Sequence, residues 1–518
     1  MGQGADPISV EVKETGMAKA IMFLGTGSDV GKSIAATAFC RIFKRRGFSV
    51  APFKAQNMSN NSYVTMEGGE IGRAQVVQAE ACGLLPSVHM NPVLLKPSTA
   101  IGAQIVLHGK VINQMDAADY HQFKPRLKKA VMASYSYLSE RYNLIVMEGA
   151  GSCCEMNLKG NDLVNLPMAL AANAPCILVA DIDRGGVFAQ LIGTYNLMSR
   201  KEKAITIGFL INKFRGDASL FDSGIDYIEK KTGKPVLGLV PFYHDILIDS
   251  EDSVAVQEDR LSIMPTGPDT INIAVLRLPA ISNFTDIQAF LREKDVTVNY
   301  LSRPEDLPGG DLPGDYDCLI IPGTKNVMED AVWVAGLGWT SVIRRFAQRK
   351  MVIGICGGYQ LLGENILDPY GVESDRKVIK GIGLLPVETV LEKQKIVRKV
   401  AGTCISNGSR IEGYEIHMGK TSVLDKTIEP FLKIHEPGKD DWWLDGCCLK
   451  AGHIAGTYVH GIFDMPGFRT AFLNALRRGK GLKEASPRQG RHPRFDQYDL
   501  LADHFEKHCN VDRIISYV

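Results

Sequence analysis

Short apolar runs alternate with longer segments of helical periodicity along the first half of the chain. The segments between the runs carry apolar residues at helical spacing, which indicates amphipathic helices. Alternation of this kind predicts an α/β domain with a mostly parallel sheet covered by helices on both faces. The predicted strands of this first domain are Ala20–Leu24, Ser49–Pro52, Leu144–Met147, Cys176–Ala180, Ile205–Ile211 and Val236–Val240.

A second alternating pattern begins near residue 271, after an acidic stretch that ends in Met264-Pro-Thr-Gly-Pro268. Such a composition shift is typical of a domain boundary. We therefore predict a first domain over 18–245, a linker over 246–270, a second α/β domain over 271–480, and a helical tail over 481–518 without an assigned function. The predicted strands of the second domain are Ile271–Arg277, Val296–Leu301, Cys318–Ile321 and Met351–Ile355.

The first predicted strand runs directly into Gly25-Thr-Gly-Ser-Asp-Val-Gly-Lys-Ser33, and a helical pattern follows. A glycine-rich turn between a strand and a helix predicts a phosphate-binding loop for a nucleoside triphosphate, ATP. Lys32 places a positive charge on the terminal phosphates, and the Ser33 hydroxyl is a ligand for Mg²⁺. The loop is one residue longer than the common form, because Thr26 stands where a glycine is usual. The predicted nucleotide-binding residues of the loop are Thr26, Gly27, Asp29, Val30, Gly31, Lys32 and Ser33.

Polar residues also follow the other predicted strands of the first domain, and parallel strands end on one edge of a sheet. Glu148 is predicted to hold Mg²⁺ beside Ser33, and Lys54 to neutralise a transferring phosphoryl group or bind a substrate carboxylate. Asn212 is a candidate for reading the nucleotide base, although a cap or turn role fits equally well. Asp181 is a substrate, phosphate or metal candidate. The segment 54–62 is rich in amides and hydroxyls and predicts a polar ligand, and a helix is predicted from Glu70 to about Gly83.

The last strand of the second pattern runs into Gly354-Ile-Cys356-Gly-Gly358, a cysteine at a tight strand-to-helix turn. This turn is typical of a nucleophile whose sulfur is presented at a helix N-terminus. The backbone N–H of Gly357, with that of Gly323 on the neighbouring strand, is predicted to stabilise an oxyanion. A thiol nucleophile needs a base, and we assign this role to His460. The competing histidine, His417, is given a substrate or interdomain role.

Composition narrows the class of protein. A chain of 518 residues is too long to fold around one hydrophobic core, so two or three domains are expected. A net charge of +1 gives no electrostatic reason to expect nucleic acid or membrane as a partner. No apolar run approaches the ~20 residues of a membrane span. Eleven cysteines without regular spacing argue against a disulfide framework, so a reducing cytoplasm is expected. Residues 1–18 have no apolar core and are not expected to be a signal peptide.

A cysteine turn and a distant histidine, fused to a phosphate-loop domain, resemble class I glutamine amidotransferases joined to a dethiobiotin-synthetase-like ATPase. Within that group the chain resembles the cobyric acid synthase family. The longer phosphate loop is a trait of this group. The other motifs that carry the resemblance are Val50–Asn57, Met90–Pro97, Asp181–Phe188, Gly323–Asn326 and Gly413–Gly419.

The resemblance implies a flavodoxin-like amidotransferase domain in which Cys356 attacks the side-chain amide of L-glutamine and His460 shuttles protons. It implies that ATP and Mg²⁺ activate carboxylates of a corrinoid, adenosylcobyrinic acid a,c-diamide, as acyl phosphates. Ammonia from glutamine then amidates the b, d, e and g carboxylates. The chain departs from the family pattern at two places. Cys153-Cys154 replaces an expected Pro-Ala, and Ile462 stands where amidotransferases with a catalytic triad carry a glutamate. Asp464 lies two positions further, and the group that orients His460 is unidentified.

Three other interpretations stay open at this stage. Cobyrinic acid a,c-diamide synthase performs the same chemistry on an earlier substrate, but segment 54–62 and Met90–Pro97 favour the later enzyme. A regulatory or partitioning ATPase with a non-catalytic amidotransferase-like domain would not need an intact Cys356 and His460. A scaffold protein that merely binds nucleotide would not need polar residues after so many strands.

Overall fold

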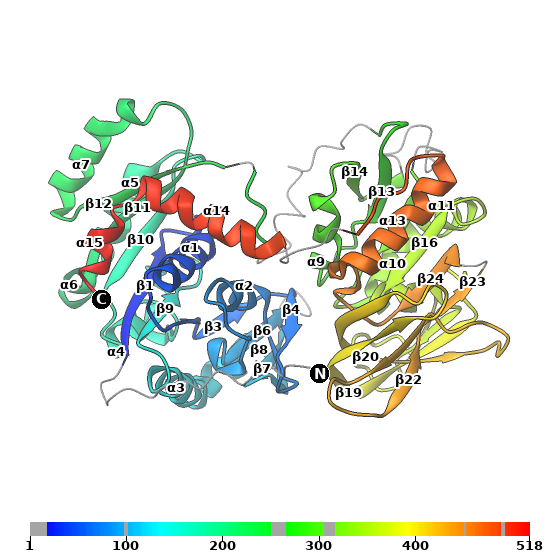
Figure 1. Ribbon diagram of the computed structural model, residues 1–518. Coiled ribbons are helices and arrows are strands. Elements are labelled where there is room, and N and C mark those ends of the chain that lie inside the picture. Colours follow the sequence, from blue (N-terminus) through cyan, green and yellow to red (C-terminus); the bar gives the residue numbers. More distant parts are fainter. Residues whose placement is uncertain are drawn as a thin grey trace, which may run out of the picture.

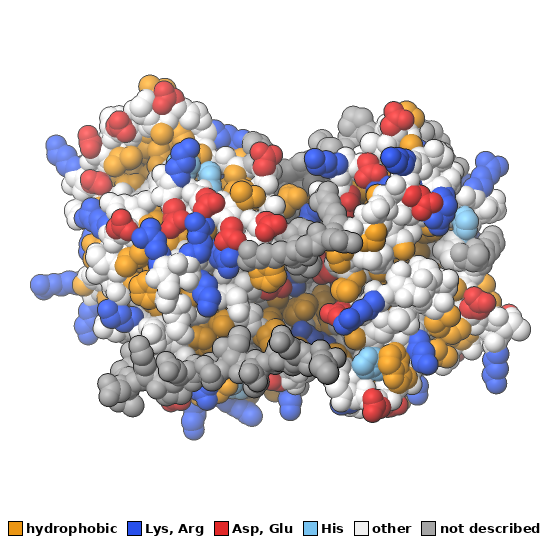
Figure 2. Space-filling model, viewed as in Figure 1, with side chains coloured by type: hydrophobic (Ala, Val, Ile, Leu, Met, Phe, Trp, Pro, Cys, Tyr) orange, Lys and Arg blue, Asp and Glu red, His pale blue; other side chains and the backbone are white. Residues whose placement is uncertain are grey.

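The computed structural model describes residues 18–97, 102–243, 245–249, 266–304, 316–449, 452–487 and 493–518. The chain forms two lobes that lie side by side, each built around a parallel sheet (Figure 1). A groove separates the lobes on the face shown in Figure 2. None of the described helices combines the length and the hydropathy that crossing a lipid bilayer requires.

The sheet of the N-terminal lobe has the order β12-β11-β10-β1-β9-β2, and all its neighbouring strands are parallel. Alternate residues of β1 pack on opposite faces, because Ile21 and Phe23 join one buried cluster while Met22 and Leu24 join another. The predicted strands are confirmed, with ends that shift by a few residues. The strands are β1 (Lys19–Gly25), β2 (Val50–Phe53), β9 (Leu144–Glu148), β10 (Cys176–Asp181), β11 (Thr206–Phe214) and β12 (Val236–Pro241).

Helices cover both faces of this sheet. Helix α1 (Lys32–Arg45) buries Phe39 and Phe43 against β1, and it carries the predicted phosphate loop at its start. Helix α2 begins at Arg73, so the predicted helix start at Glu70 is wrong: residues 70–72 pair with β4 as a strand. The other helices of this lobe are α2 (Arg73–Ala81), α3 (Ala117–Ser139), α4 (Leu166–Ala171), α5 (Val187–Leu197), α6 (Arg200–Ile205) and α7 (Asp222–Thr232).

Residues 56–116 add two small sheets that the periodicity did not predict. One has the order β3-β6-β7-β8, and the other is the antiparallel pair β4-β5. The pair β4-β5 lies on the side of the N-terminal lobe that faces the other lobe (Figure 1). These strands are β3 (Gln56–Met58), β4 (Ser62–Val64), β5 (Glu70–Gly72), β6 (Val93–Pro97), β7 (Gly102–Leu107) and β8 (Lys110–Asp116).

The main sheet of the second lobe has the order β14-β13-β15-β16-β24-β23, parallel except for β23 at one edge. Its four predicted strands are confirmed. The strands are β13 (Ile271–Leu276), β14 (Val296–Leu301), β15 (Cys318–Ile321), β16 (Met351–Ile355), β23 (Cys447–Leu449) and β24 (Ile454–Thr457). The helices around it are α9 (Thr285–Gln288), α10 (Val327–Gly336), α11 (Trp339–Phe346), α12 (Gly357–Leu362) and α13 (Pro466–Lys480).

A second, largely antiparallel sheet, which the hydrophobic pattern did not predict, lies beside the main sheet of this lobe. Its longest strands, β19 and β20, form a hairpin. Strand β20 contacts β4 of the N-terminal lobe. The strands are β17 (Asn365–Leu367), β18 (Val378–Lys380), β19 (Val387–Cys404), β20 (Arg410–Val423), β21 (Leu432–His435) and β22 (Trp442–Asp445).

The C-terminal tail returns to the N-terminal lobe as α14 (Pro493–His508) and α15 (Val511–Ile515), which lie against α1 and β12 (Figure 1). Phe505 is buried against Phe39, with ring centroids 6.3 Å apart. Arg41 of α1 forms an ion pair of 2.7 Å with Asp499. The tail therefore completes the first lobe, a role that its sequence did not indicate. Of the expected linker 246–270, the structure describes 246–249 and 266–270.

Candidate active sites

The loop between β1 and α1 has the form of a phosphate cradle. Lys32 is buried at the start of α1, and its Nζ donates to the carbonyl of Gly27 (2.7 Å), so its charge lies across the loop. Gly31 has a φ of +99°, and a Cβ there would lie 2.0 Å from Nδ2 of Asn212. That amide donates to the carbonyl of Val30 (3.0 Å). Asn212 therefore holds the loop in place, and its predicted reading of a base stays a prediction.

Two further predicted residues of the loop, Thr26 and Asp29, are held by neighbouring elements. The N–H of Thr26 donates to the carbonyl of Val179 in β10 (3.0 Å), and its hydroxyl donates to Gln190 (3.2 Å). Asp29 has a φ of +55°, and its carbonyl accepts from Nζ of Lys213 (2.7 Å). Contacts with other parts of the lobe thus help to keep the loop in shape, in addition to the bond from Lys32 to Gly27.

Glu148 lies fully buried below the loop, at the end of β9. Its Oε1 accepts from the Ser33 hydroxyl (2.7 Å) and from Nζ of Lys54 (2.8 Å), and its Oε2 accepts from Gln78 (2.6 Å). Hydroxyl and carboxylate oxygens are the ligand types that Mg²⁺ takes from proteins when phosphate oxygens complete its shell. The pair Ser33 and Glu148 therefore fits the predicted metal. Among the described residues there is no group of three or more His, Cys, Asp or Glu side chains that could hold a metal ion. A metal at Ser33 and Glu148 would therefore need oxygens of the nucleotide phosphates as further ligands.

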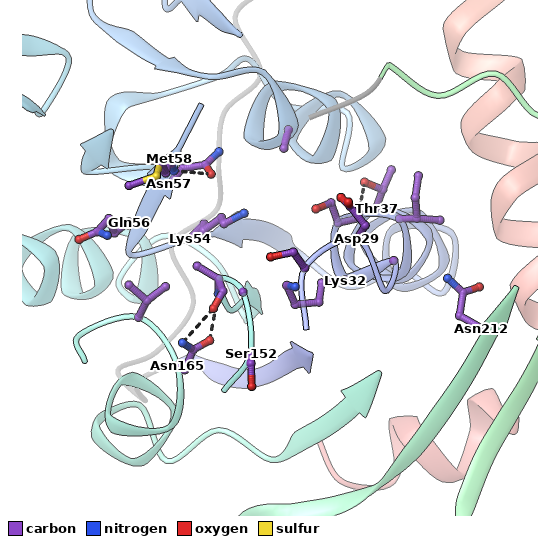
Figure 3. Close-up of a pocket in the computed structure, with 18 of the residues that line it drawn as sticks. Asp29, Lys32, Thr37, Lys54, Gln56, Asn57, Met58, Ser152, Asn165 and Asn212 are labelled. Carbon is purple, nitrogen blue, oxygen red and sulfur yellow. Dashed lines mark hydrogen bonds between the residues drawn. The ribbon is translucent and has the colours of Figure 1, made fainter. Parts of the chain in front are cut away.

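A cavity of about 950 Å³ opens over the phosphate loop (Figure 3). Its wall includes Asp29, Lys32 and Ser33 of the loop, Lys54 and the residues of β3, and Asn212. Segment 54–62, predicted to meet a polar ligand, thus reaches the cavity through Lys54 and residues 56–58. Asp181 is not part of the cavity wall; it is buried and paired with Lys213 (2.7 Å). Its predicted contact with substrate or phosphate stays a prediction.

In the second lobe, Cys356 lies at the turn between β16 and α12 with a φ of +52° and a ψ of −108°. A left-handed φ in a residue other than glycine stores backbone strain, and such strain is common where a nucleophile is presented. The N–H of Cys356 donates to the carbonyl of Thr457 at the end of β24 (2.8 Å). His460 follows that strand, so the neighbouring strands β16 and β24 bring the predicted nucleophile and base to one edge.

His460 is fully buried, and its Nδ1 donates to Oδ2 of Asp286 (2.7 Å). The other oxygen of Asp286 accepts from the N–H of Gly461 (2.7 Å). Burial lowers the pKa of His460, but the Asp286 carboxylate and then the Cys356 thiol outweigh it and raise the pKa to about 10. The imidazolium form therefore prevails at neutral pH, and it stabilises a nearby thiolate. Its Nε2 makes no hydrogen bond of ordinary geometry within the described part of the chain.

Both predicted oxyanion residues lie against this centre. A Cβ on Gly323 would lie 2.9 Å from Cε1 of His460, and a Cβ on Gly357 would lie 2.5 Å from Cγ2 of Thr324. Neither position has room for a side chain. His417 instead stacks on Tyr458, with ring centroids 3.8 Å apart.

Asp286 is the group that holds the imidazole of His460, and no motif in the sequence identified it. The hydrogen bond to Nδ1 of His460 is made by Asp286 and not by Ile462 or Asp464. Asp286 belongs to the short helix α9, which follows β13, so it reaches the same carboxyl edge of the sheet as Cys356 and His460. The polar run Ser282-Asn-Phe-Thr-Asp286 after the first strand of the second domain was the available signal.

Two family models match the chain, one for each lobe. Residues 21–254 match the CobQ/CobB/MinD/ParA nucleotide binding domain. Residues 272–468 match the CobB/CobQ-like glutamine amidotransferase domain. The first match includes the phosphate loop, and the second includes Cys356, His460 and Asp286.

Curated relatives extend the similarity to nearly the whole chain. A cobyric acid synthase of Syntrophobacter fumaroxidans is 45% identical over 511 residues, covering 96% of this chain and 98% of the relative. A cobyric acid synthase of Dehalococcoides mccartyi is 45% identical over 509 residues, with the same coverage. One of a Geobacillus species is 46% identical over 506 residues, again covering 96% and 98%.

Proposed function

The chain belongs to the cobyric acid synthase family, and from that premise we propose that its two sites divide one glutamine-dependent amidation between them. The enzyme is an ATP-dependent amidoligase with a glutamine amidotransferase domain. The proposed substrate is adenosylcobyrinic acid a,c-diamide, and the proposed product carries four further amides at the b, d, e and g positions. The observation that carries the proposal is the buried Asp286–His460 pair beside Cys356, on the same chain as a phosphate loop.

In the second lobe, the Cys356 thiolate attacks the amide carbon of glutamine, and Gly323 and Gly357 stabilise the oxyanion. His460 donates a proton to the departing ammonia, so the carbon–nitrogen bond breaks and a thioester forms. Water then hydrolyses the thioester to glutamate, and His460 takes up the proton that water releases. Asp286 keeps Nδ1 protonated, which leaves Nε2 for this proton transfer.

In the first lobe, Lys32 and the loop N–H groups bind the phosphates of ATP. Lys54 neutralises charge on the transferring phosphoryl group, which a corrinoid carboxylate accepts to form an acyl phosphate. Ammonia displaces phosphate from that acyl group and leaves an amide. When bound by Ser33 and Glu148, Mg²⁺ would neutralise charge on the nucleotide phosphates.

Mass spectrometry tests the proposal directly. Adenosylcobyrinic acid a,c-diamide incubated with the enzyme, ATP, Mg²⁺ and glutamine is expected to gain four amides, each replacing one hydroxyl by one amino group. Adenosylcobyrinic acid without its a and c amides is the comparison substrate. If only that acid were amidated, and at two carboxylates, the enzyme would be a cobyrinic acid a,c-diamide synthase.

Replacing Asp286 with asparagine is expected to lower glutamine-dependent amidation by about 10²-fold. Removal of the carboxylate removes the main cause that raises the pKa of His460, while burial still lowers it. The imidazolium therefore loses its proton at a lower pH, and the alkaline limb of the rate profile for glutamine hydrolysis moves to lower pH. The pH profile of glutamate release checks this, and an unshifted limb would contradict the role of Asp286.

A further inference from the structure

Two large apolar side chains are left half exposed on the wall of the cavity over the phosphate loop. Met58, the last residue of β3, is 55% exposed, and Leu158, between β9 and α4, is 49% exposed. Both line the cavity. Single exposed apolar side chains are common on protein surfaces, but on a cavity wall they belong to the surface that a ligand covers. Met58 and Leu158 are therefore candidates for contact with a ligand that has an apolar face.

Both residues lie on segments that start from one buried ion pair. Nζ of Lys54 lies 2.8 Å from Oε1 of Glu148, and both side chains are buried. From Lys54 the chain runs along β3 to Met58, and from Glu148 it runs directly into the segment that carries Leu158. The proposed phosphoryl transfer takes place beside Lys54, so two short stretches of chain connect the reacting group with the two apolar side chains.

Met58 and the phosphate loop lie on different sides of Lys54. In Figure 3, Met58 is to the left of Lys54, whereas Lys32 of the loop and Asn212 are to the right. The loop binds the nucleotide phosphates, and a phosphoryl group moves in line from the leaving oxygen to the attacking one. The acceptor therefore approaches from the side opposite the loop, which is the side of Met58.

The wall beside Leu158 has a mixed charge. Among the described residues of α3 and of the segment after β9, the cavity is lined by one cation, Lys124, and by two carboxylates, Glu155 and Asp162. Burial lowers the pKa of Lys124, and the Asp162 carboxylate partly offsets this effect. A polyanion therefore gains little from charge at this wall, whereas an apolar ring face gains from covering Leu158.

The proposed substrate combines an apolar ring with charged arms. A corrin ring is a broad macrocycle with methyl groups on both faces, and its carboxylates lie on arms at the rim. Each amidation removes one negative charge from the rim and leaves the ring unchanged. Apolar contact has no preferred direction, and methionine adapts its shape to a ligand. Such a surface holds the ring equally well before each of the four amidations, in whichever orientation brings a carboxylate to Lys54.

We propose that Met58 and Leu158 form an apolar seat for the corrin ring, from which each of the four carboxylates is presented to Lys54. The seat makes the affinity for the corrinoid depend on the ring and not on the charge of its arms. This inference rests on the proposed function, because it takes the corrinoid as the acceptor. It assigns the holding of the substrate to the seat and the holding of the reacting group to Lys54.

The test measures the Kd of two corrinoids by equilibrium dialysis against the full-length enzyme with Mg²⁺ and a non-hydrolysable ATP analogue. The corrinoids are adenosylcobyrinic acid a,c-diamide and the product with four further amides. In wild type the two Kd values are expected to agree within about threefold, at about 0.05 M and at about 0.5 M salt alike. Met58→Gln and Leu158→Asn are each expected to raise both Kd values about tenfold, because less apolar surface is covered. Met58→Leu stays apolar and is expected to keep both values.

Met66→Gln and Leu197→Asn are the matched controls. Met66 is 54% exposed and Leu197 is 51% exposed in the same lobe, and neither lines the cavity. Both variants are expected to keep the wild-type Kd values. The affinity for ATP is expected to stay unchanged in Met58→Gln and Leu158→Asn, because the seat holds the acceptor and not the nucleotide.

Unchanged Kd values in both Met58→Gln and Leu158→Asn would overturn the seat and leave the proposed function intact. Binding more than about tenfold weaker for the product, or for both corrinoids at the higher salt, would also overturn it, because charge would then hold the ligand. An equal loss of ATP affinity in the two variants would show that these side chains support the nucleotide instead. Wild-type enzyme that binds neither corrinoid would overturn the proposed function itself.

Discussion

Replacing Cys356 with alanine is expected to lower glutamine-dependent amidation by at least about 10⁴-fold and to leave amidation driven by ammonium salts intact. The sulfur is the atom that forms the thioester, and His460 cannot replace it as a nucleophile in the geometry that Asp286 imposes. The phosphate loop and its cavity lie in the other lobe and keep their contacts. Mass spectrometry of the corrinoid product, with glutamine or ammonium as the nitrogen source, measures both activities.

Cys448→Ala is the matched control, since Cys448 is another buried thiol of the same lobe, on the edge strand β23. It is expected to keep both activities. If Cys356→Ala still used glutamine, the turn at 354–358 would not be the glutaminase centre. If it lost the ammonium reaction as well, the two lobes would not act as separable sites.

The parallel sheets could be predicted because their strands are buried on both faces. Strand β1 contributes Phe23 to one cluster and Met22 to the other, and such strands appear in the sequence as unbroken apolar runs. The small sheets could not be predicted in the same way. Strands β3 and β4 are three residues long, too short to show a periodic pattern, and the middle of β19, residues 392–399, does not alternate between buried and exposed positions. Their pairing depends on segments distant in the sequence.

In the candidate sites, too, some residues could be predicted from the sequence and others could not. Lys32, Ser33 and Cys356 belong to local motifs, because the loop or turn itself performs the chemistry. Asp286 belongs to no motif of this kind: its role depends on β13, β16 and β24 ending at the same edge of one sheet, which is a property of sheet order. The same holds for the C-terminal tail: Asp499 stabilises its position by an ion pair with Arg41, which is distant in the sequence. Residues within a motif were therefore predictable, whereas Asp286 and the Arg41–Asp499 pair, whose roles depend on contacts between distant segments, were not.

Replacing Lys32 with alanine is expected to lower amidation from glutamine and from ammonium alike, by about 10³-fold. Lys32 is the cation of the phosphate loop, and its Nζ lies across the loop on the carbonyl of Gly27. Without it, charge that develops on the transferring phosphoryl group loses its nearest compensation within the loop. The measurement is amide formation with each nitrogen source at saturating ATP.

Lys44→Ala separates this effect from a change in the helix, because Lys44 lies exposed in the last turn of the same helix α1. That variant is expected to keep both activities. Slow glutamate release without ATP should persist in Lys32→Ala, since Cys356, His460 and Asp286 are untouched. Loss of that release would show that the substitution unfolds the enzyme, and full amidation would show that the loop is not where the phosphoryl group is transferred. Together with Cys356→Ala, the two substitutions assign acyl activation to one lobe and nitrogen release to the other.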